Sequence, residues 1–228
     1  MDSPKSVYLS VIIPTYNEEK RLAGTLRSVF NYLKAQPYTW EIVVAAGVST
    51  DGTRALVKKM QSEIPNLQLL ALKENKGKGF AIKQAMLSVL GEYRLFMDAD
   101  NSTKISELNN FWPYFKEGHD VVVGSIEVKG ATIKEEAGPH RRFLGKAAKW
   151  LIRFVALPGI MDSQRGFKCF SRKAAQVIFP KQTIDKWGFD IEILLIARRA
   201  GFKIKELPVQ WDNRGESKVT LGAYISTF

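Results

Sequence analysis

The 228-residue sequence is poor in the residues that build disulfides and metal–thiolate centres. It has one cysteine, Cys169, and two histidines, His119 and His140. One thiol cannot form an internal disulfide, and these three side chains do not make a Cys/His zinc site. The scarcity of cysteine fits a reducing compartment, and we expect a cytoplasmic protein.

Long apolar runs are also missing. No stretch approaches the ~20 apolar residues of a membrane span, and the first ten residues have no apolar core of signal-peptide length. The chain ends in GAYISTF without a turn signal or a polar tail. Truncation at the carboxyl end, with a membrane segment beyond Phe228, therefore stays open.

Positive charge is abundant: 34 Lys and Arg stand against 23 Asp and Glu, for a net charge of +11. Such an excess attracts nucleic acid, nucleotides or an anionic membrane surface. A recognition helix and an aromatic platform for single strands are not apparent, so we do not expect nucleic acid as the partner.

Strand-like and helix-like runs alternate along the chain. Apolar runs predict strands at 7–14, 41–46, 67–72, 93–99 and 120–128, and helical spacing predicts helices at 17–34, 51–64, 79–90 and 105–116. This order is typical of an α/β protein with a mostly parallel sheet and helices on both faces. We expect one domain over 1–228, with ligands at the carboxyl ends of the strands.

Two acids follow the fourth predicted strand, in FMDADNST. Asp98 and Asp100 stand one residue apart, and two such close carboxylates repel each other unless a cation lies near them. Oxygen ligands of this kind suit Mg²⁺ or Mn²⁺ bridging to substrate phosphates. A turn with an aspartate helix cap is the structural alternative.

Other segments are weaker signals. ENKGKGFAIKQA (74–85) is a basic, glycine-rich loop before a helix, which suits phosphate. The segment 140–155 predicts a basic amphipathic helix, suited to a membrane interface or to covering the core. Asp162 lies in a loop before a short apolar strand. Asp190 and Glu192 begin an apolar helix, where acids favour the helix dipole.

Taken in order, VIIPTYNEE, STDGT, NKGKG, MDAD, DSQRGFK, WGFDIE and GESK resemble the family 2, GT-A-fold glycosyltransferases. The nearest subgroup is the dolichyl-phosphate β-glucosyltransferase type, with dolichol-phosphate mannose synthases close by. The resemblance covers about residues 8–219. It implies an inverting, metal-dependent transfer of a sugar, glucose from UDP-glucose, to a polyprenyl or dolichyl phosphate at a membrane surface.

The resemblance also implies roles for individual residues. Asp98 and Asp100 would bind the metal, and Asp100 and Asp162 would be catalytic, with the role of Asp162 open. The donor would be bound by the following residues: Pro14, Tyr16, Glu18, Ala46, Gly47, Lys78, Asp98, Arg141, Arg142 and Arg214.

Three positions depart from the family pattern. Ala46 and Gly47 stand where members usually carry acids, the first of which commonly pairs with the base. Ile126 replaces a phosphate-binding arginine, and Ser102 replaces a metal-binding glutamine of some mannose synthases. Two alternatives stay open: a transferase with a soluble or surface glycan acceptor, and a degenerate nucleotide-sugar-binding scaffold.

Overall fold

The structure is a computed structural model that describes residues 6–134 and 157–212. Its centre is a seven-stranded sheet in the order β3-β2-β1-β4-β7-β5-β8. The strands are β1 (Leu9–Thr15), β2 (Trp40–Ala46), β3 (Leu67–Ala71), β4 (Tyr93–Met97), β5 (Val121–Ser125), β7 (Phe167–Ser171) and β8 (Ile204–Pro208). All neighbouring pairs are parallel except those of β7, which is antiparallel to β4 and β5.

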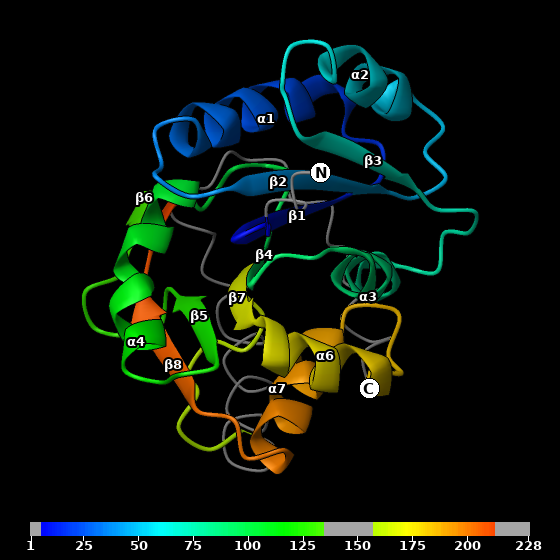
Figure 1. Cartoon of the computed structure of the whole chain (residues 1–228). Helices are drawn as coiled ribbons and strands as arrows, with labels where there is room; N and C mark the ends of the chain where they lie inside the picture. Colours follow the sequence, from blue (N-terminus) through cyan, green and yellow to red (C-terminus); the bar gives the residue numbers. More distant parts are fainter. Residues whose placement is uncertain (1–5, 135–156, 213–228) are drawn as a thin grey trace.

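Helices cover both faces of this sheet (Figure 1). They are α1 (Glu19–Leu33), α2 (Thr53–Met60), α3 (Lys78–Ser88), the 3₁₀ helix η1 (Ile105–Asn110), α4 (Trp112–Lys116), α6 (Arg172–Lys181) and α7 (Phe189–Arg199). A small parallel pair joins β6 (Thr132–Lys134) to β9 (Gln210–Asp212). No helix in the described ranges is long and apolar enough to cross a bilayer.

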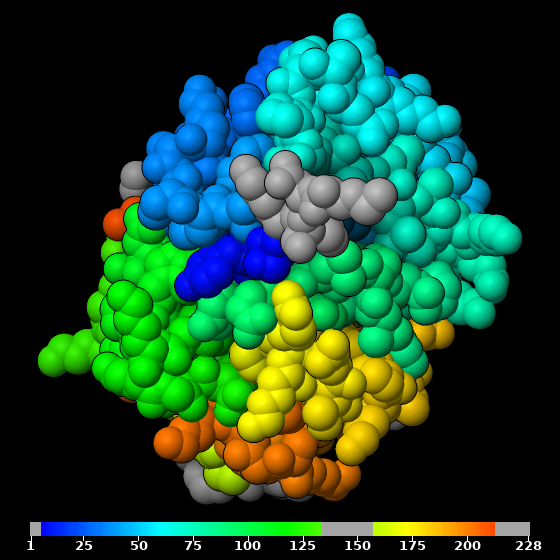
Figure 2. Space-filling model, viewed as in Figure 1, coloured from blue at the N-terminus to red at the C-terminus, as the bar shows by residue number. Residues whose placement is uncertain are grey.

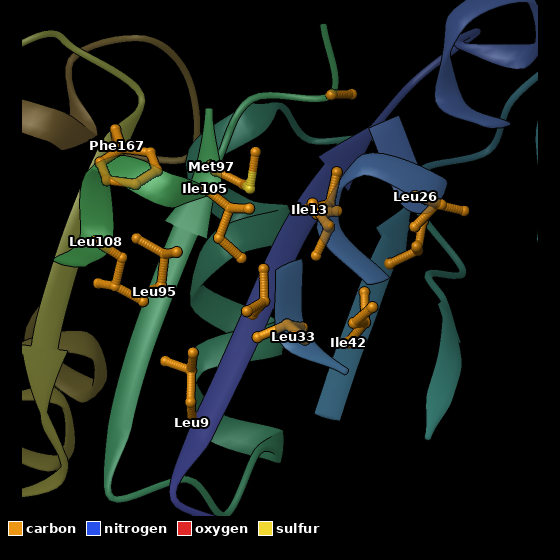
Figure 3. Close-up of a cluster of buried hydrophobic side chains, with 14 of the residues drawn as sticks. Leu9, Ile13, Leu26, Leu33, Ile42, Leu95, Met97, Ile105, Leu108 and Phe167 are labelled. Carbon is orange, nitrogen blue, oxygen red and sulfur yellow. The ribbon is translucent and has the colours of Figure 1, made fainter. Parts of the chain in front are cut away.

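The strands are apolar on both faces because each face has its own core. In β1, Leu9 and Ile13 pack with α1, α2 and η1, whereas Ile12 packs with α3, α6 and α7. Side chains alternate along a strand, so a strand covered on both sides needs a continuous apolar run. Figure 3 shows part of the first core, in which Leu26 and Leu33 of α1 lie over the strands. The predicted mostly parallel sheet with helices on both faces is confirmed.

The prediction of one continuous helix over 105–116 is wrong. The chain forms η1, and α4 then starts at Trp112 with Pro113 in its first turn. Proline lacks the amide that a continuous helix requires and clashes with the preceding turn, which explains the break. In the space-filling view, the blue and cyan N-terminal part lies at the top, the green segments lie at the left, and the yellow and orange C-terminal part lies at the bottom (Figure 2).

Candidate functional site

Candidate residues from several strands gather at one edge of the sheet. β1 ends at Thr15, which is in register with Ala46 at the end of β2. β4 ends at Met97, directly before Asp98. Because β7 runs in the opposite direction, its first residue, Phe167, pairs with Met97, and the two lie together in Figure 3. The segment that enters β7 therefore reaches the same edge as Asp98.

Gly166 allows these two segments to approach closely. The Asp98 amide donates to the Gly166 carbonyl oxygen at 3.1 Å. A Cβ atom at position 166 would lie 2.2 Å from Oδ2 of Asp98, far inside a van der Waals contact. Only glycine at this position leaves the Asp98 carboxylate where it is.

Lys78 is the direct partner of Asp98. Its Nζ lies 2.5 Å from Oδ1 of Asp98, and the Lys78 and Asp98 side chains are 16% and 38% exposed. The ammonium also lies 5.5 Å from the centre of the Trp187 ring. Burial alone would lower the pKa of Lys78, but the negative charges of Asp98 and Asp190 outweigh burial and raise it. The structure thus brings the predicted residues Lys78 and Asp98 together.

The donor atoms around Asp98 fit a hard divalent cation. Asp100 is half-buried, and its Oδ1 accepts from the Ser102 amide at 2.9 Å. Oδ1 of Asn101, one residue away, is buried and has no hydrogen-bond partner among the described residues. Those residues contain no cluster of three or more His, Cys, Asp or Glu side chains that could hold a metal. Mg²⁺ commonly uses only one or two carboxylates and completes its shell with substrate phosphates and water, so the carboxylates of Asp98 and Asp100 would be enough.

Asp162 is buried within its own loop. Its Oδ2 lies 3.3 Å from the Ile126 amide and 3.4 Å from Nε of Arg165, and its Oδ1 accepts from the Gln164 amide at 3.3 Å. These donors orient the carboxylate. Such an environment suits a positioning group, because the carboxylate is already engaged.

Glu206 of β8 anchors the loop that contains Asp162. Its Oε2 accepts from the Met161 amide and its Oε1 from the Asp162 amide, both at 2.7 Å. Two charge-assisted bonds of this length make a strong anchor. Sequence reasoning did not identify Glu206, since the anchor joins residues 44 positions apart.

Arg165 extends the charged cluster toward β9. Its guanidinium lies 4.8 Å from the centre of the Trp211 ring and contacts Asp162 on another side. An arginine held by a carboxylate and an aromatic face is oriented at low entropy cost. It supplies positive charge near the edge where Ile126 departs from the family pattern.

The end of β2 forms the other side of the site. Tyr16 is exposed, and a Cβ atom at Gly47 would lie 3.6 Å from its ring and 3.3 Å from the side chain of Asn75. Pro14, half-buried, lies in β1 opposite Ala45. The structure therefore places Pro14, Tyr16 and Gly47 on one side of the site, where the aromatic ring of Tyr16 is exposed.

The backbone carbonyls at the end of β2 already accept hydrogen bonds from within the protein. Arg54, which sequence reasoning missed, donates to the carbonyls of Ala46 and Gly47 at 3.1 Å and to that of Leu72 at 2.5 Å. The methyl group of Ala46 is fully buried in the core on the α1 side. Arg54 therefore occupies the backbone carbonyls of both Ala46 and Gly47.

Glu18 lies at the start of α1 and is mostly buried. Its carboxylate pairs with Arg21, and its amide donates to the Thr53 hydroxyl at 2.8 Å. Nearby, Asp51 accepts from the hydroxyl and amide of Thr53 and from the amide of Glu19. These bonds outweigh the effect of burial and lower the pKa of Asp51. Glu18 and Asp51 thus tie the start of α1 to the start of α2 beside the site.

Comparison with known proteins decides the family. Residues 10–179 match the model described as glycosyl transferase family 2. The chain belongs to glycosyl transferase family 2. This confirms the resemblance seen in the motifs, and it identifies the chain as a glycosyltransferase.

Individual relatives of this glycosyltransferase agree with that assignment. It is 40% identical to "Dolichyl-phosphate beta-glucosyltransferase ALG5A" of Trichomonas vaginalis, over 97% of this chain and 71% of the relative. Glucosyl-3-phosphoglycerate synthase of Mycobacterium tuberculosis, crystallised with Mn²⁺, UDP and phosphoglyceric acid, has a TM-score of 0.70 at 18% identity, covering 97% and 74% of the two chains. S. aureus TarS 1–349 has a TM-score of 0.63 at 20% identity, with 90% of this chain and 60% of that one covered. The predicted GT-A fold is confirmed.

The glycine-rich loop of the glycosyltransferase serves packing. Gly77, with φ 128°, and Gly79 leave room for the backbone carbonyls of Asp185 and Ile184, each 2.6 Å from where a Cβ would lie. The Asp185 carbonyl also accepts from the Phe80 amide at 2.9 Å. One amide of the first turn of α3 is therefore not available to a phosphate.

A buried ion pair lies behind the site of the glycosyltransferase. Nζ of Lys168 lies 2.5 Å from Oδ1 of Asp190, and the two side chains are 0% and 2% exposed. Lys168 also donates to the Arg165 carbonyl. Burial raises the pKa of Asp190, against the opposing effects of Lys168 and Lys78. Sequence reasoning explained Asp190 by the helix dipole and missed this pairing.

Three predicted donor-binding residues of the glycosyltransferase, Arg141, Arg142 and Arg214, lie outside the described residues, as does the predicted helix over 140–155. The last described residue, Asp212, donates its amide to the Ser102 carbonyl at 2.8 Å. The described chain that ends at Asp212 thus runs beside the segment that follows Asp100.

Proposed function

We propose that this glycosyltransferase moves glucose from UDP-glucose to a dolichyl or polyprenyl phosphate, with inversion and with a divalent metal. The observation that carries this proposal is the cluster of Asp98, Asp100 and Lys78 beside the Asp162 loop at the carboxyl edge of the sheet. The similarity to the Trichomonas vaginalis relative supports the sugar and the acceptor. The neighbour crystallised with Mn²⁺ and UDP supports the metal and nucleotide classes.

The donor would lie across the ends of β1, β2 and β4. Tyr16 and Gly47, with Pro14 behind them, would face the nucleoside. Asp98 and Asp100 would hold Mg²⁺ or Mn²⁺, whose chemistry is to stabilise negative charge on a diphosphate. Lys78 would add a second positive charge to the same leaving group.

In the reaction, an oxygen of the acceptor phosphate forms a bond to C1 of the sugar, and the bond from C1 to the diphosphate oxygen breaks on the opposite face. The electron pair of that bond leaves with UDP. A phosphate monoester has a second pKa of ~6, so the attacking oxygen is already anionic at neutral pH and no proton has to be removed.

Because the acceptor phosphate needs no general base, we assign Asp162 a positioning role. Its carboxylate contacts Arg165 and two backbone amides. It would therefore orient the guanidinium toward the acceptor phosphate. Arg141, Arg142 and Arg214 would bind further phosphate oxygens. The net charge of +11 supports work at an anionic membrane surface, and we propose the cytosolic face.

The test is transfer of radiolabelled glucose from UDP-glucose to dolichyl phosphate in vesicles, with Mn²⁺ or Mg²⁺. We expect labelled lipid with wild type and a loss of about 100-fold or more for Asp100→Asn, which removes a charge from the metal site. Asp120→Asn is the matched control, because Asp120 precedes β5 at the opposite edge of the sheet.

Each outcome separates the alternatives. Labelled soluble glycan in place of lipid would favour a glycan acceptor, and tight UDP binding without transfer to any acceptor would favour a scaffold. Equal activity of wild type and Asp100→Asn would refute the metal assignment.

A further inference from the structure

We propose that Lys78 is the resident counter-ion of Asp98 and leaves this carboxylate when the metal and the nucleotide diphosphate bind, so that the two ligands bind cooperatively. This inference rests on the proposed function, since it takes Asp98 as a metal ligand. It adds a property that the site residues alone do not define: the strength of the coupling between metal and donor.

The geometry of Lys78 provides the first step. Its Nζ lies 2.5 Å from Oδ1 of Asp98, so the ammonium would repel a divalent cation that binds the same carboxylate. A cation that arrives alone meets a carboxylate whose charge this ammonium already neutralises, and it must work against the repulsion or displace the ammonium. Metal without donor should therefore bind weakly.

The surroundings of Lys78 give the ammonium a place to go. Its side chain is 16% exposed and lies beside Trp187, so it has access to the open edge of the sheet. Asp190 attracts the same ammonium from behind, although Lys168 already neutralises this acid. A diphosphate brings several negative charges to the edge, and a short movement of the lysine would pair it with them while the metal takes Asp98.

The consequence is a positive coupling between the two ligands. Each ligand removes part of the cost of releasing Asp98 from Lys78, and coupling of this kind is reciprocal. Removing the charge of Lys78 should therefore strengthen metal binding in the absence of nucleotide and weaken the effect of nucleotide on metal binding.

The test measures free Mn²⁺ by electron paramagnetic resonance during titration of the full chain, with and without UDP. For Lys78→Met we expect Mn²⁺ alone to bind about tenfold or more tightly than to wild type, because a positive charge next to the ligand is gone. The increase in Mn²⁺ affinity that UDP causes should shrink by a similar factor. Lys78→Arg keeps the charge and should keep most of the coupling.

Lys76→Met is the matched control. Lys76 is two residues away on the same loop, but its ammonium is more exposed and pairs with Glu74 at 2.9 Å, so its loss should leave Mn²⁺ affinity unchanged. A folded Lys78→Met chain that binds Mn²⁺ no better than wild type would overturn the counter-ion role. The same affinity gain with Lys76→Met would also overturn it, because the effect would then be general charge.

Asp98→Asn separates this inference from the function on which it rests. Loss of Mn²⁺ binding in the presence of UDP supports the metal site. If Asp98→Asn binds Mn²⁺ as well as wild type does under these conditions, the metal assignment fails, and the role of Lys78 fails with it.

Discussion

The buried pair of Lys168 and Asp190 allows a quantitative prediction of stability. The side chains are 0% and 2% exposed, and their charged atoms lie 2.5 Å apart. Lys168→Met would leave the Asp190 carboxylate buried without its main partner. Removing one member of a buried pair costs about 3–5 kcal/mol, and for a chain of this size that corresponds to a fall in Tm of about 10 °C.

The double variant Lys168→Met/Asp190→Asn tests the cause. It removes both charges at similar volume, so we expect it to recover most of the lost free energy of unfolding. Recovery should be incomplete, because Lys168 also donates to the Arg165 carbonyl. Urea unfolding followed by tryptophan fluorescence measures all three chains.

The pH dependence gives a second, signed result. Burial raises the pKa of Asp190, and the loss of Lys168 removes a charge that opposes this rise. A carboxyl group whose pKa is higher in the folded state binds more protons there, so its penalty is largest at high pH and is relieved as pH falls through the folded-state pKa. The loss of unfolding free energy in Lys168→Met, measured relative to wild type at each pH, should therefore be smaller at pH 5 than at pH 8. We expect it to shrink by about 1 kcal/mol or more over this range. A deficit below ~1 kcal/mol at pH 8, or a double variant less stable than the single one, would refute the reasoning.

Three further variants test the Asp162 loop. Asp162→Asn should keep kcat within about tenfold of wild type if the group only positions Arg165, whereas loss of a true general base costs about 10²–10⁴-fold, and a transfer assay decides. Gly166→Ala should displace the Asp98 carboxylate and weaken Mn²⁺ binding in the presence of UDP, measured by calorimetry; unchanged affinity would contradict the 2.2 Å contact. Glu206→Gln can keep only one of two accepted amide bonds, so unfolding free energy should fall by about 1–3 kcal/mol in a urea titration, and no change would show that the anchor is unimportant.

The sequence predicted the fold wherever the pattern was local. The five predicted strands were found because strands covered on both faces are apolar throughout, as in β1, β2 and β5. The helix over 105–116 failed at Pro113, where apolar spacing continues although the backbone cannot. The direction of β7 was not predictable, because the residues of a strand do not encode the direction of its neighbours.

In the candidate site, too, only residues with a local sequence signal could be predicted. Asp98 and Asp100 were found because they directly follow an apolar strand in one short motif. Arg54, Glu206 and Lys168 were missed because each acts on a partner through the fold: Glu206 holds an amide 44 residues away, and Lys168 holds an acid 22 residues away. No local pattern distinguishes such residues from solvated charges on a surface.

The position of β7 has a consequence for the order of folding. The strands β1 to β4 follow one another in the first half of the chain. The second half of the sheet attaches through β7, whose Ser171 pairs with Tyr93 of β4 across a long stretch of sequence. Contacts that close long loops form slowly, and domains emerge from the amino terminus during synthesis. We expect the nascent chain to form the β3-β2-β1-β4 half first, with Asp98 and Asp100 already at its edge. We expect Asp162 to take its place only later, after Glu206 of β8 is available to anchor its loop.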